Sequence, residues 1–126
     1  MTSKKILIVD DSRFMRIVFK KLFDDIEDEY MEVIGEASNG VEALDAINTL
    51  KPDIIILDFT LPDINGITLA KKILDINSDA KIILSATPGK MPQVRQALDC
   101  RIKDIIEKPF HPERALETVI KVIMED

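Results

Sequence analysis

Four short apolar runs in this chain each lead into side chains that phosphoryl chemistry can use. The side chains at or just beyond the ends of these runs are Asp10, Asp11, Asp58, Ser85 and Lys108. Short β-branched runs that alternate with helical stretches are typical of buried parallel strands. In an open parallel α/β sheet, ligands bind outside the carboxyl ends of the strands. We therefore expect three carboxylates, a hydroxyl and an ammonium to meet in one crevice, where they could hold a hard divalent cation and a phosphoryl group together.

The acidic pair Asp10-Asp11 favours a metal site, because like charges at adjacent positions repel and a buried pair needs a compensating cation. Mg²⁺ prefers one or two carboxylates together with water and phosphate oxygens. Lys108 could supply a point charge for the same phosphate. Pro109 restricts Lys108 to extended backbone, which fixes where its side chain starts. Simpler roles stay open on the residues alone: Asp11 or Ser12 could cap the first helix, and Lys108 could be a solvated surface lysine.

The composition indicates one globular domain in a reducing compartment. The chain has 126 residues, of which 46% are hydrophobic and 32% charged, as in a globular rather than a disordered protein. Its net charge of −6 argues against binding to a nucleic-acid backbone, and no apolar stretch approaches the roughly 18 residues of a membrane span. The single cysteine, Cys100, cannot form an internal disulfide and is interpreted as a packing residue. We expect a cytoplasmic protein with no nucleic-acid or membrane partner.

Five strands are predicted to alternate with five amphipathic helices. The strands are expected at 5–10, 32–37, 53–58, 80–85 and 103–107. The helical faces are expected at Phe14, Ile17, Val18, Lys21 and Leu22; Val41, Leu44 and Ile47; Ile67, Ala70, Ile73 and Leu74; Val94, Ala97 and Leu98; and Leu116, Val119, Ile120 and Ile123. Pro112 suits the first turn of the last helix. This alternation predicts an α/β fold, a doubly wound parallel sheet with right-handed crossovers and helices on both faces.

Four motifs carry a family resemblance by their order and spacing. They are Ile8-Val9-Asp10-Asp11-Ser12, then residues 58–66 (DFTLPDING), then Leu84-Ser85-Ala86, then Lys108-Pro109-Phe110. Over essentially the whole chain, 1–126, the sequence resembles the receiver domain of two-component response regulators in its stand-alone, CheY-like form. The resemblance implies a flavodoxin-like (βα)5 fold with strand order 2-1-3-4-5. It also implies a single receiver domain at 1–126 without an output domain in this chain.

The resemblance implies the roles of the acidic residues. Asp58 would be the phosphoacceptor, a carboxylate nucleophile that becomes an aspartyl phosphate. Asp11 and Asp58 would ligate Mg²⁺ directly, together with the backbone carbonyl of Thr60, and Asp10 would contribute through water. The metal would draw charge off the transferring phosphoryl group.

The remaining site residues also take their roles from the resemblance. Ser85 would turn its hydroxyl toward a phosphoryl oxygen, and Lys108 would pair with the phosphoryl group. Thr60, Ala86 and Thr87 would line the phosphosite, and the two threonines lie where the family tunes access of the hydrolysing water. The receiver would catalyse its own phosphorylation and slow dephosphorylation, and would be a switch rather than a turnover enzyme.

The same resemblance implies partners. The donor would be a phosphohistidine on a sensor histidine kinase, and the run from Asp10 to Arg16 is similar to chemotaxis receivers, whose target is often the flagellar motor switch or its adaptor. A phosphorelay intermediate or a regulator of another pathway stays open. The target would bind the face made by the fourth helix, fifth strand and fifth helix, here with Lys90, Met91, Arg95 and Ile105. Burial of Met91 is favoured over a contact role, as is a core position for Phe14, and a monomer is expected.

Two features depart from the family pattern. Receivers commonly carry an aromatic residue three positions before the lysine, where this chain has Ile105, so coupling by rotation of an aromatic ring cannot operate. The segment 87–92 contains two prolines around Gly89, and Pro92 is expected to start the fourth helix. We hypothesise that output depends on shifts in this segment. Pro62 and Gly66 frame the loop after Asp58, and Gly66 can adopt a positive φ where other residues meet a steric cost. A loop that shapes the site and an ordinary turn that opens the third helix both stay open.

The alternatives from other classes fit less well. A haloacid-dehalogenase-like phosphatase needs a second carboxylate two residues after the nucleophile, where this chain has Thr60. An EF-hand loop around 63–66 would run from Leu61 to Lys72 and would lack both required carboxylates. A flavin site lacks a phosphate loop rich in Ser, Thr and Gly. The intact set of acidic, hydroxyl and lysine residues argues against a degenerate receiver that only binds a partner.

Overall fold

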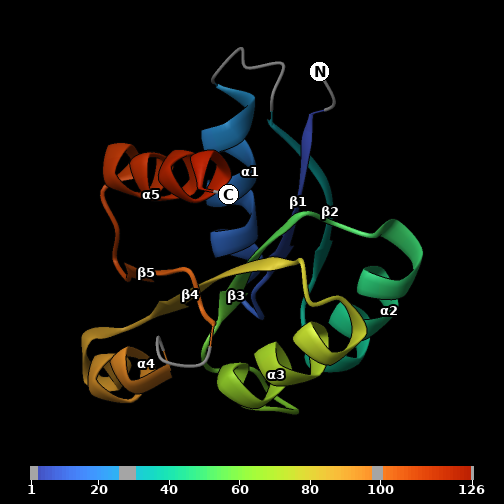
Figure 1. The fold of residues 1–126 in the computed structure, drawn as a ribbon. Helices are drawn as coiled ribbons and strands as arrows, with labels where there is room; N and C mark the ends of the chain where they lie inside the picture. The colour runs from blue at the N-terminus through green and yellow to red at the C-terminus, as the bar shows by residue number, and fades with distance from the viewer. Residues whose placement is uncertain (1–2, 26–30, 98–100, 126) are drawn as a thin grey trace.

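The computed structural model describes residues 3–25, 31–97 and 101–125, so Leu98 and Cys100 lie outside the described residues. Strands and helices alternate from end to end (Figure 1). They are β1 (Lys4–Val9), α1 (Arg13–Asp24), β2 (Met31–Ala37), α2 (Gly40–Leu50), β3 (Ile54–Asp58), α3 (Gly66–Ile76), β4 (Lys81–Ala86), the short 3-10 helix η1 (Pro88–Lys90), α4 (Met91–Ala97), β5 (Asp104–Glu107) and α5 (Pro112–Met124). Each predicted strand is found within one residue of its expected bounds.

The five strands form one parallel sheet in the order β2-β1-β3-β4-β5, which confirms the predicted topology. The order reverses direction at β1, so the chain winds outward on both sides of it. In the β3–β4 register Asp58 lies opposite Ser85, and in the β4–β5 register Ser85 lies opposite Ile106. The sequence therefore places Asp58 and Ser85 side by side at the carboxyl edge.

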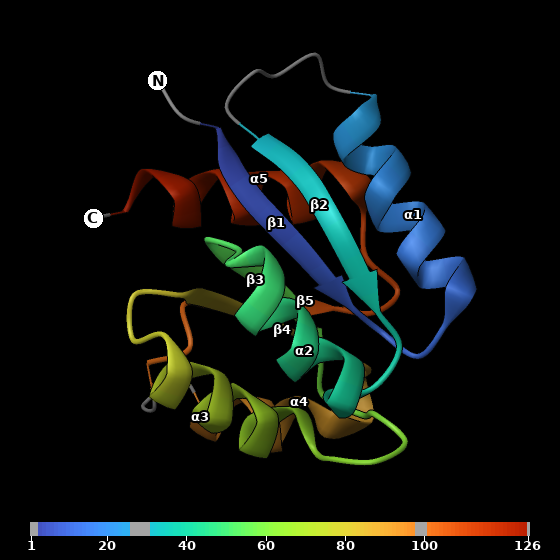
Figure 2. The same ribbon diagram turned by 90° about the vertical axis from the view of Figure 1, so that its right-hand side faces the viewer.

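Helices cover both faces of the sheet, as predicted (Figures 1 and 2). α1 and α5 cover one face, and α2, α3 and α4 cover the other. Residues of the central strands alternate between the two cores: Ile6, Ile8 and Ile56 join the α1/α5 side, whereas Leu7 and Leu57 join the opposite side. Because both faces are covered, β1 and β3 are near-continuous apolar runs rather than alternating ones. Within the described ranges, no helix has the length and apolar character that crossing a membrane requires.

The inward face of α1 differs from the prediction. Phe14 was expected in the core, but 71% of it is exposed, and Ile17 is 52% exposed. The buried residues are Phe19 and Phe23, with Met15 packed beside them. The apolar side chains of α1 form one broad face, and its sequence allows a stripe of helical period along either edge of that face. The core prefers the stripe with the larger aromatic area and no lysine, because more apolar surface is then buried.

Candidate functional site

Three aspartates converge at the carboxyl edge of the sheet. Asp10 follows β1 and Asp58 ends β3, and both are buried, whereas Asp11 is exposed. Ligand oxygens of Asp10, Asp11 and Asp58 all lie within 4.8 Å of one another. Neighbouring parallel strands that end at one edge bring these carboxylates together, as expected from the sequence.

Lys108 places a positive charge beside these carboxylates. Its ammonium lies 2.7 Å from Asp10 Oδ2 and 3.4 Å from Asp58 Oδ2. The side chain is only 14% exposed, so the alternative of a solvated surface lysine is wrong. The Lys108 N–H donates to the carbonyl of Ala86 at 2.7 Å, and beyond the cis peptide to Pro109 the Phe110 ring stacks on Phe19 at 4.7 Å. These contacts fix the lysine backbone against β4 and the α1 core.

Burial and, to a smaller extent, the negative charge of Asp10 raise the pKa of Asp58 from 3.8 to about 6. The charge of Lys108 and the N–H of Thr60, which donates to Asp58 Oδ1 at 3.3 Å, act in the opposite direction. Because burial and the charge of Asp10 disfavour the ionised form of Asp58, an added positive charge would stabilise that form. The site therefore favours a divalent cation at Asp58.

Ser85 is the buried polar group without a partner. It is 1% exposed, and within the described part of the chain its Oγ makes no hydrogen bond. Its carbonyl accepts the N–H of Phe59 at 2.8 Å, which fixes the serine backbone next to Asp58. Buried hydroxyls normally have a partner, so an orphan in a native fold calls for an explanation such as a missing ligand. An incoming oxygen atom bound to Asp58 would provide one.

The corner between β1 and α1 is tied down by several hydrogen bonds. Ser12 caps α1 by accepting the Met15 N–H at 3.2 Å, and Asp10 Oδ1 accepts the Ser12 N–H at 2.9 Å. The cap is thus Ser12, which leaves the Asp11 carboxylate available. Arg16 donates to the carbonyl of Asp10 at 2.7 Å and to Glu36 at 2.8 Å. Sequence reasoning missed Arg16, although its place one turn after the acidic pair is a usable signal.

The loop between Asp58 and α3 is held at three points. Asn65 caps α3 by accepting the N–H groups of Ile67 and Thr68, and Thr60 forms a bridge with Asn65. The Asp63 carboxylate accepts the N–H groups of Gly40 and Val41 at the start of α2, which lowers its pKa. Sequence reasoning also missed this contact of Asp63, because nothing in the local pattern links Asp63 to α2.

Gly66 does not use the positive φ that a glycine can adopt. No glycine in the described residues has a positive φ. The reason for a glycine here is space, because a Cβ at position 66 would lie 2.7 Å from both the carbonyl oxygen of Asp58 and the Cα of Phe59. Its N–H donates to the Phe59 carbonyl at 2.7 Å. Gly66 therefore lets α3 start directly against the strand end that carries Asp58.

The other expected lining residues surround the same edge. Ala86, at the end of β4, is buried, while Thr60 and Thr87 are exposed at the rim. The segment after β4 continues through η1 into α4, which starts at Met91 rather than at Pro92. The oxygen-only donor set of three carboxylates against one lysine fits a hard divalent cation such as Mg²⁺, and the orphan Ser85 hydroxyl fits a neighbouring oxyanion.

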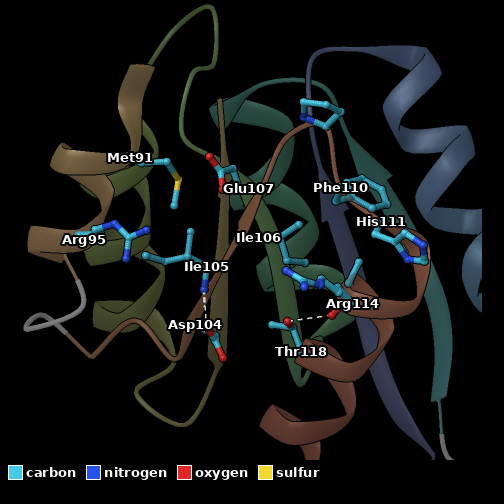
Figure 3. A pocket seen from close by; sticks show the side chains of 12 residues that line it. Met91, Arg95, Asp104, Ile105, Ile106, Glu107, Phe110, His111, Arg114 and Thr118 are labelled. Atoms are coloured by element: carbon cyan, nitrogen blue, oxygen red, sulfur yellow. Dashed lines mark hydrogen bonds between the residues drawn. The ribbon is translucent and has the colours of Figure 1, made fainter. Parts of the chain in front are cut away.

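A second hollow, of about 640 Å³, lies between α4 and α5 over β5 (Figure 3). It contains three of the four residues expected on a partner-binding face, and the fourth, Lys90, is exposed at the end of η1. Met91 is only 8% exposed, which confirms the packing interpretation, and Ile105 is partly buried. Arg95 from α4 and Arg114 from α5 point toward β5 from opposite sides (Figure 3). Ile105 is part of the lining between them.

The fold and the site define a doubly wound (βα)5 domain whose carboxyl edge carries three carboxylates and a paired lysine. The family model of the response regulator receiver domain matches residues 6–120. The chain is 44% identical to the chemotaxis protein CheY of Thermotoga maritima and 38% identical to that of Bacillus subtilis, each over 94% of this chain and 97% of the relative. It is also similar to the structure of a CheX-CheY-BeF3-Mg complex from Borrelia burgdorferi, with TM-score 0.84 and 31% identity over 97% of this chain and 90% of the other. This chain belongs to the response regulator receiver domain family.

Proposed function

We propose that this chain is a phosphorylation-activated signalling switch that accepts a phosphoryl group on Asp58 from a sensor histidine kinase and then changes its binding to a downstream protein. The observation that carries the proposal is the buried Asp58 beside Asp10, Asp11, Lys108 and an orphan Ser85 hydroxyl. We propose further that residues 1–126 act as one receiver domain, as a monomer in the cytoplasm. Such a chain is modified once per signal and is not a turnover enzyme.

In the proposed transfer, an oxygen of Asp58 attacks the phosphorus of a phosphohistidine. A bond forms between this oxygen and phosphorus while the phosphorus–nitrogen bond to the donor breaks, and the histidine leaves with its electron pair and takes a proton from solvent. Mg²⁺, when bound, would offset the charge on the transferring phosphoryl oxygens. Asp11, Asp58 and the carbonyl of Thr60 would hold it directly, and Asp10 would contribute through water.

The residues around Asp58 would each contribute one interaction. The ammonium of Lys108, now 3.4 Å from Asp58 Oδ2, would pair with a phosphoryl oxygen once the charge of the carboxylate is lost. The hydroxyl of Ser85 would donate to a second oxygen. Ala86, Thr60 and Thr87 would line the space around the group, and the exposure of the two threonines leaves a route for the water that hydrolyses it.

The proposed pathway is chemotaxis, with the flagellar motor as the controlled machine. Support comes from the relatives named CheY at 38–44% identity over nearly the whole chain. The downstream partner would bind the hollow between α4 and α5, through Lys90, Arg95 and Ile105, with Met91 forming part of its floor. A phosphorelay role would instead predict that the phosphoryl group passes on to a second histidine.

The test is the Mg²⁺-dependent reaction with acetyl phosphate. Wild type, Asp58→Asn and the surface variant Asp75→Asn are treated with and without Mg²⁺, then compared by intact mass in acid and by Phos-tag mobility. The proposal expects one phosphoryl group on wild type and Asp75→Asn, only with Mg²⁺, and none on Asp58→Asn. Phosphorylation of Asp58→Asn would refute the assignment of the acceptor. If wild type stays unmodified even with candidate phosphorylated kinases, the chain is a phosphate-independent binding module.

A further inference from the structure

Arg16 reaches from the first turn of α1 to the peptide group that joins the two site aspartates. Its Nη1 donates to the carbonyl oxygen of Asp10 at 2.7 Å, and its Nε donates to Glu36 Oε1 on β2 at 2.8 Å. The side chain is only 14% exposed. The carbonyl that it binds belongs to the peptide unit whose nitrogen is that of Asp11. The orientation of this one peptide therefore helps to set where the two carboxylates point.

The Asp10 carbonyl needs such a donor. β1 ends at Val9, and the chain then turns away from the sheet toward α1. The N–H of Asp10 is still held by the Ala37 carbonyl at 3.0 Å, but its own carbonyl has left the strand ladder. A buried carbonyl without a donor is costly. The planar guanidinium can serve this carbonyl and Glu36 at the same time, which a single ammonium cannot do with the same geometry.

Glu36 holds the other end of the arrangement. It accepts from Arg16 and, at 3.0 Å, from Lys20, and these two cations lower its pKa. Arg16 is thereby fixed between β2 and α1, so it acts as a brace rather than as a free surface charge. Lys20 contacts the same carboxylate, but among the described residues it has no hydrogen bond or ion pair with Asp10, so it serves as a control for the contacts to Glu36.

We propose that Arg16 is a positioning residue of the acidic site: by bracing the Asp10–Asp11 peptide against β2, it sets the affinity of the site for Mg²⁺. The inference rests on the proposed function only in that Mg²⁺ is taken as the ion. Residues that orient metal ligands from outside the coordination sphere typically change metal affinity by roughly 10- to 100-fold when they are replaced. Replacing Arg16 would slow phosphorylation only by lowering Mg²⁺ occupancy, so the phosphorylation rate would recover at saturating Mg²⁺.

The test compares wild type, Arg16→Lys and Lys20→Ala by calorimetric titration with Mg²⁺. Arg16→Lys keeps the positive charge at position 16, so the net charge around the Mg²⁺ site is unchanged. Only the planar guanidinium, which donates to Asp10 and Glu36 at the same time, is lost. We expect its Mg²⁺ affinity to fall by roughly tenfold, while Lys20→Ala stays close to wild type. Circular dichroism and the thermal midpoint without Mg²⁺ show whether each variant is folded. The acetyl phosphate reaction of Arg16→Lys should need more Mg²⁺ but reach the wild-type rate at saturation.

Two outcomes would overturn the inference. Equal Mg²⁺ affinity in wild type and Arg16→Lys, with only a lower thermal midpoint, would show that Arg16 is merely structural. Absence of Mg²⁺ binding to wild type would remove the inference altogether. Because Mg²⁺ affinity is read without phosphorylation, failure of the proposed function looks different: wild type and the variants would bind Mg²⁺ as expected, but Asp58 would not be phosphorylated.

Discussion

The two sides of the acidic site differ in how completely their polar atoms are held. On the β1 side, the carboxylate, N–H and carbonyl of Asp10 all have partners, in Ser12, Lys108, Ala37 and Arg16. On the β4 side, the buried hydroxyl of Ser85 has none within the described residues. Beyond Ser85, the segment 87–90 is exposed, and a hollow with Ile105 in its lining lies over β5. We call the β1 side, with Asp10 and its partners, the fixed side of the site, because its polar atoms are held before any ligand arrives. We call the β4 side, with Ser85 and the segment 87–90, the open side, because the Ser85 hydroxyl still has a hydrogen bond to make.

This contrast indicates where a chemical event at Asp58 can change the structure. A group that already has all its partners gains little from moving, whereas an orphan hydroxyl gains a hydrogen bond when an acceptor arrives. The hypothesis that output depends on shifts in 86–92 is consistent with this, because Ser85 and Ala86 lead directly into η1 and α4. Structures with and without a phosphoryl mimic would test it, since an unmoved 86–92 segment would contradict it.

The largest expected effect comes from removing the internal cation of the fixed side. Lys108→Met leaves the buried carboxylates of Asp10 and Asp58 without their partner, so we expect the free energy of unfolding at pH 7.5 without divalent ions to fall by about 3 kcal/mol. Urea unfolding in EDTA measures it. Lys121→Met, which breaks an exposed pair with Asp104, is the control and should cost less than about 0.5 kcal/mol. Equal stabilities of wild type and Lys108→Met would show that the fixed side does not depend on this cation.

The next effect is a pH-dependent gain from Asp58→Asn. The pKa of Asp58 is raised from 3.8 to about 6 in the folded protein, so the folded state binds the proton more tightly than the unfolded chain. Wild-type stability without divalent ions should therefore fall as pH rises from about 4 through 6. Asp58→Asn should be more stable than wild type by about 1–2 kcal/mol at pH 7.5, and the difference should disappear near pH 4.

Urea unfolding of both proteins across this pH range measures the difference. The exposed residue Asp75 provides the control, since Asp75→Asn should track wild type throughout. A difference that stays constant with pH would show that the charge of Asp58 is not its cause. Added Mg²⁺ should stabilise wild type more than Asp58→Asn, because it supplies the positive charge that the carboxylates lack.

The sequence predicted the site residues at the strand ends well. The strands β1, β3 and β4 contain continuous apolar runs, and a polar residue at the end of such a run lies at the edge of the sheet. Asp10, Asp58 and Ser85 follow from this rule together with the strand order. The place of Lys108 follows less directly, because its contact with Asp10 depends on the Phe110–Phe19 stacking between elements far apart in sequence.

The sequence failed where several solutions share one local pattern. Phe14 and Phe19 both lie on apolar stripes of α1, and only packing against α5 and the sheet decides between the stripes. A glycine at position 66 is compatible with a turn of positive φ, but a close backbone approach leads to the same residue. Arg16 also reaches Glu36 on β2, and Asp63 reaches the start of α2, so these two partners cannot be found from spacing along the chain.

A smaller effect is expected on the open side. Ser85→Ala removes a hydroxyl that makes no hydrogen bond in the described structure, so the free energy of unfolding without Mg²⁺ should change by less than about 1 kcal/mol. After acetyl phosphate treatment, Asp58 should still be modified. We expect hydrogen exchange over 87–92 to change in wild type, and this change should be reduced in Ser85→Ala. A loss of more than about 2 kcal/mol in the unmodified protein would mean that Ser85 already has a partner.

The smallest effect is expected at Phe14, on the outward face of the helix that supports the fixed side. Phe14 is 71% exposed, so Phe14→Ala should change the free energy of unfolding by no more than about 0.5 kcal/mol. The matched control is Phe19→Ala, which removes a fully buried ring and its stacking on Phe110 and should cost about 3 kcal/mol or more. Urea unfolding measures both. Mg²⁺ affinity should be unchanged in Phe14→Ala, because the β1–α1 corner is held by Ser12, Arg16 and the inward face of α1. A large loss of stability in Phe14→Ala would instead place this ring in the core and return α1 to the orientation that its sequence first suggested.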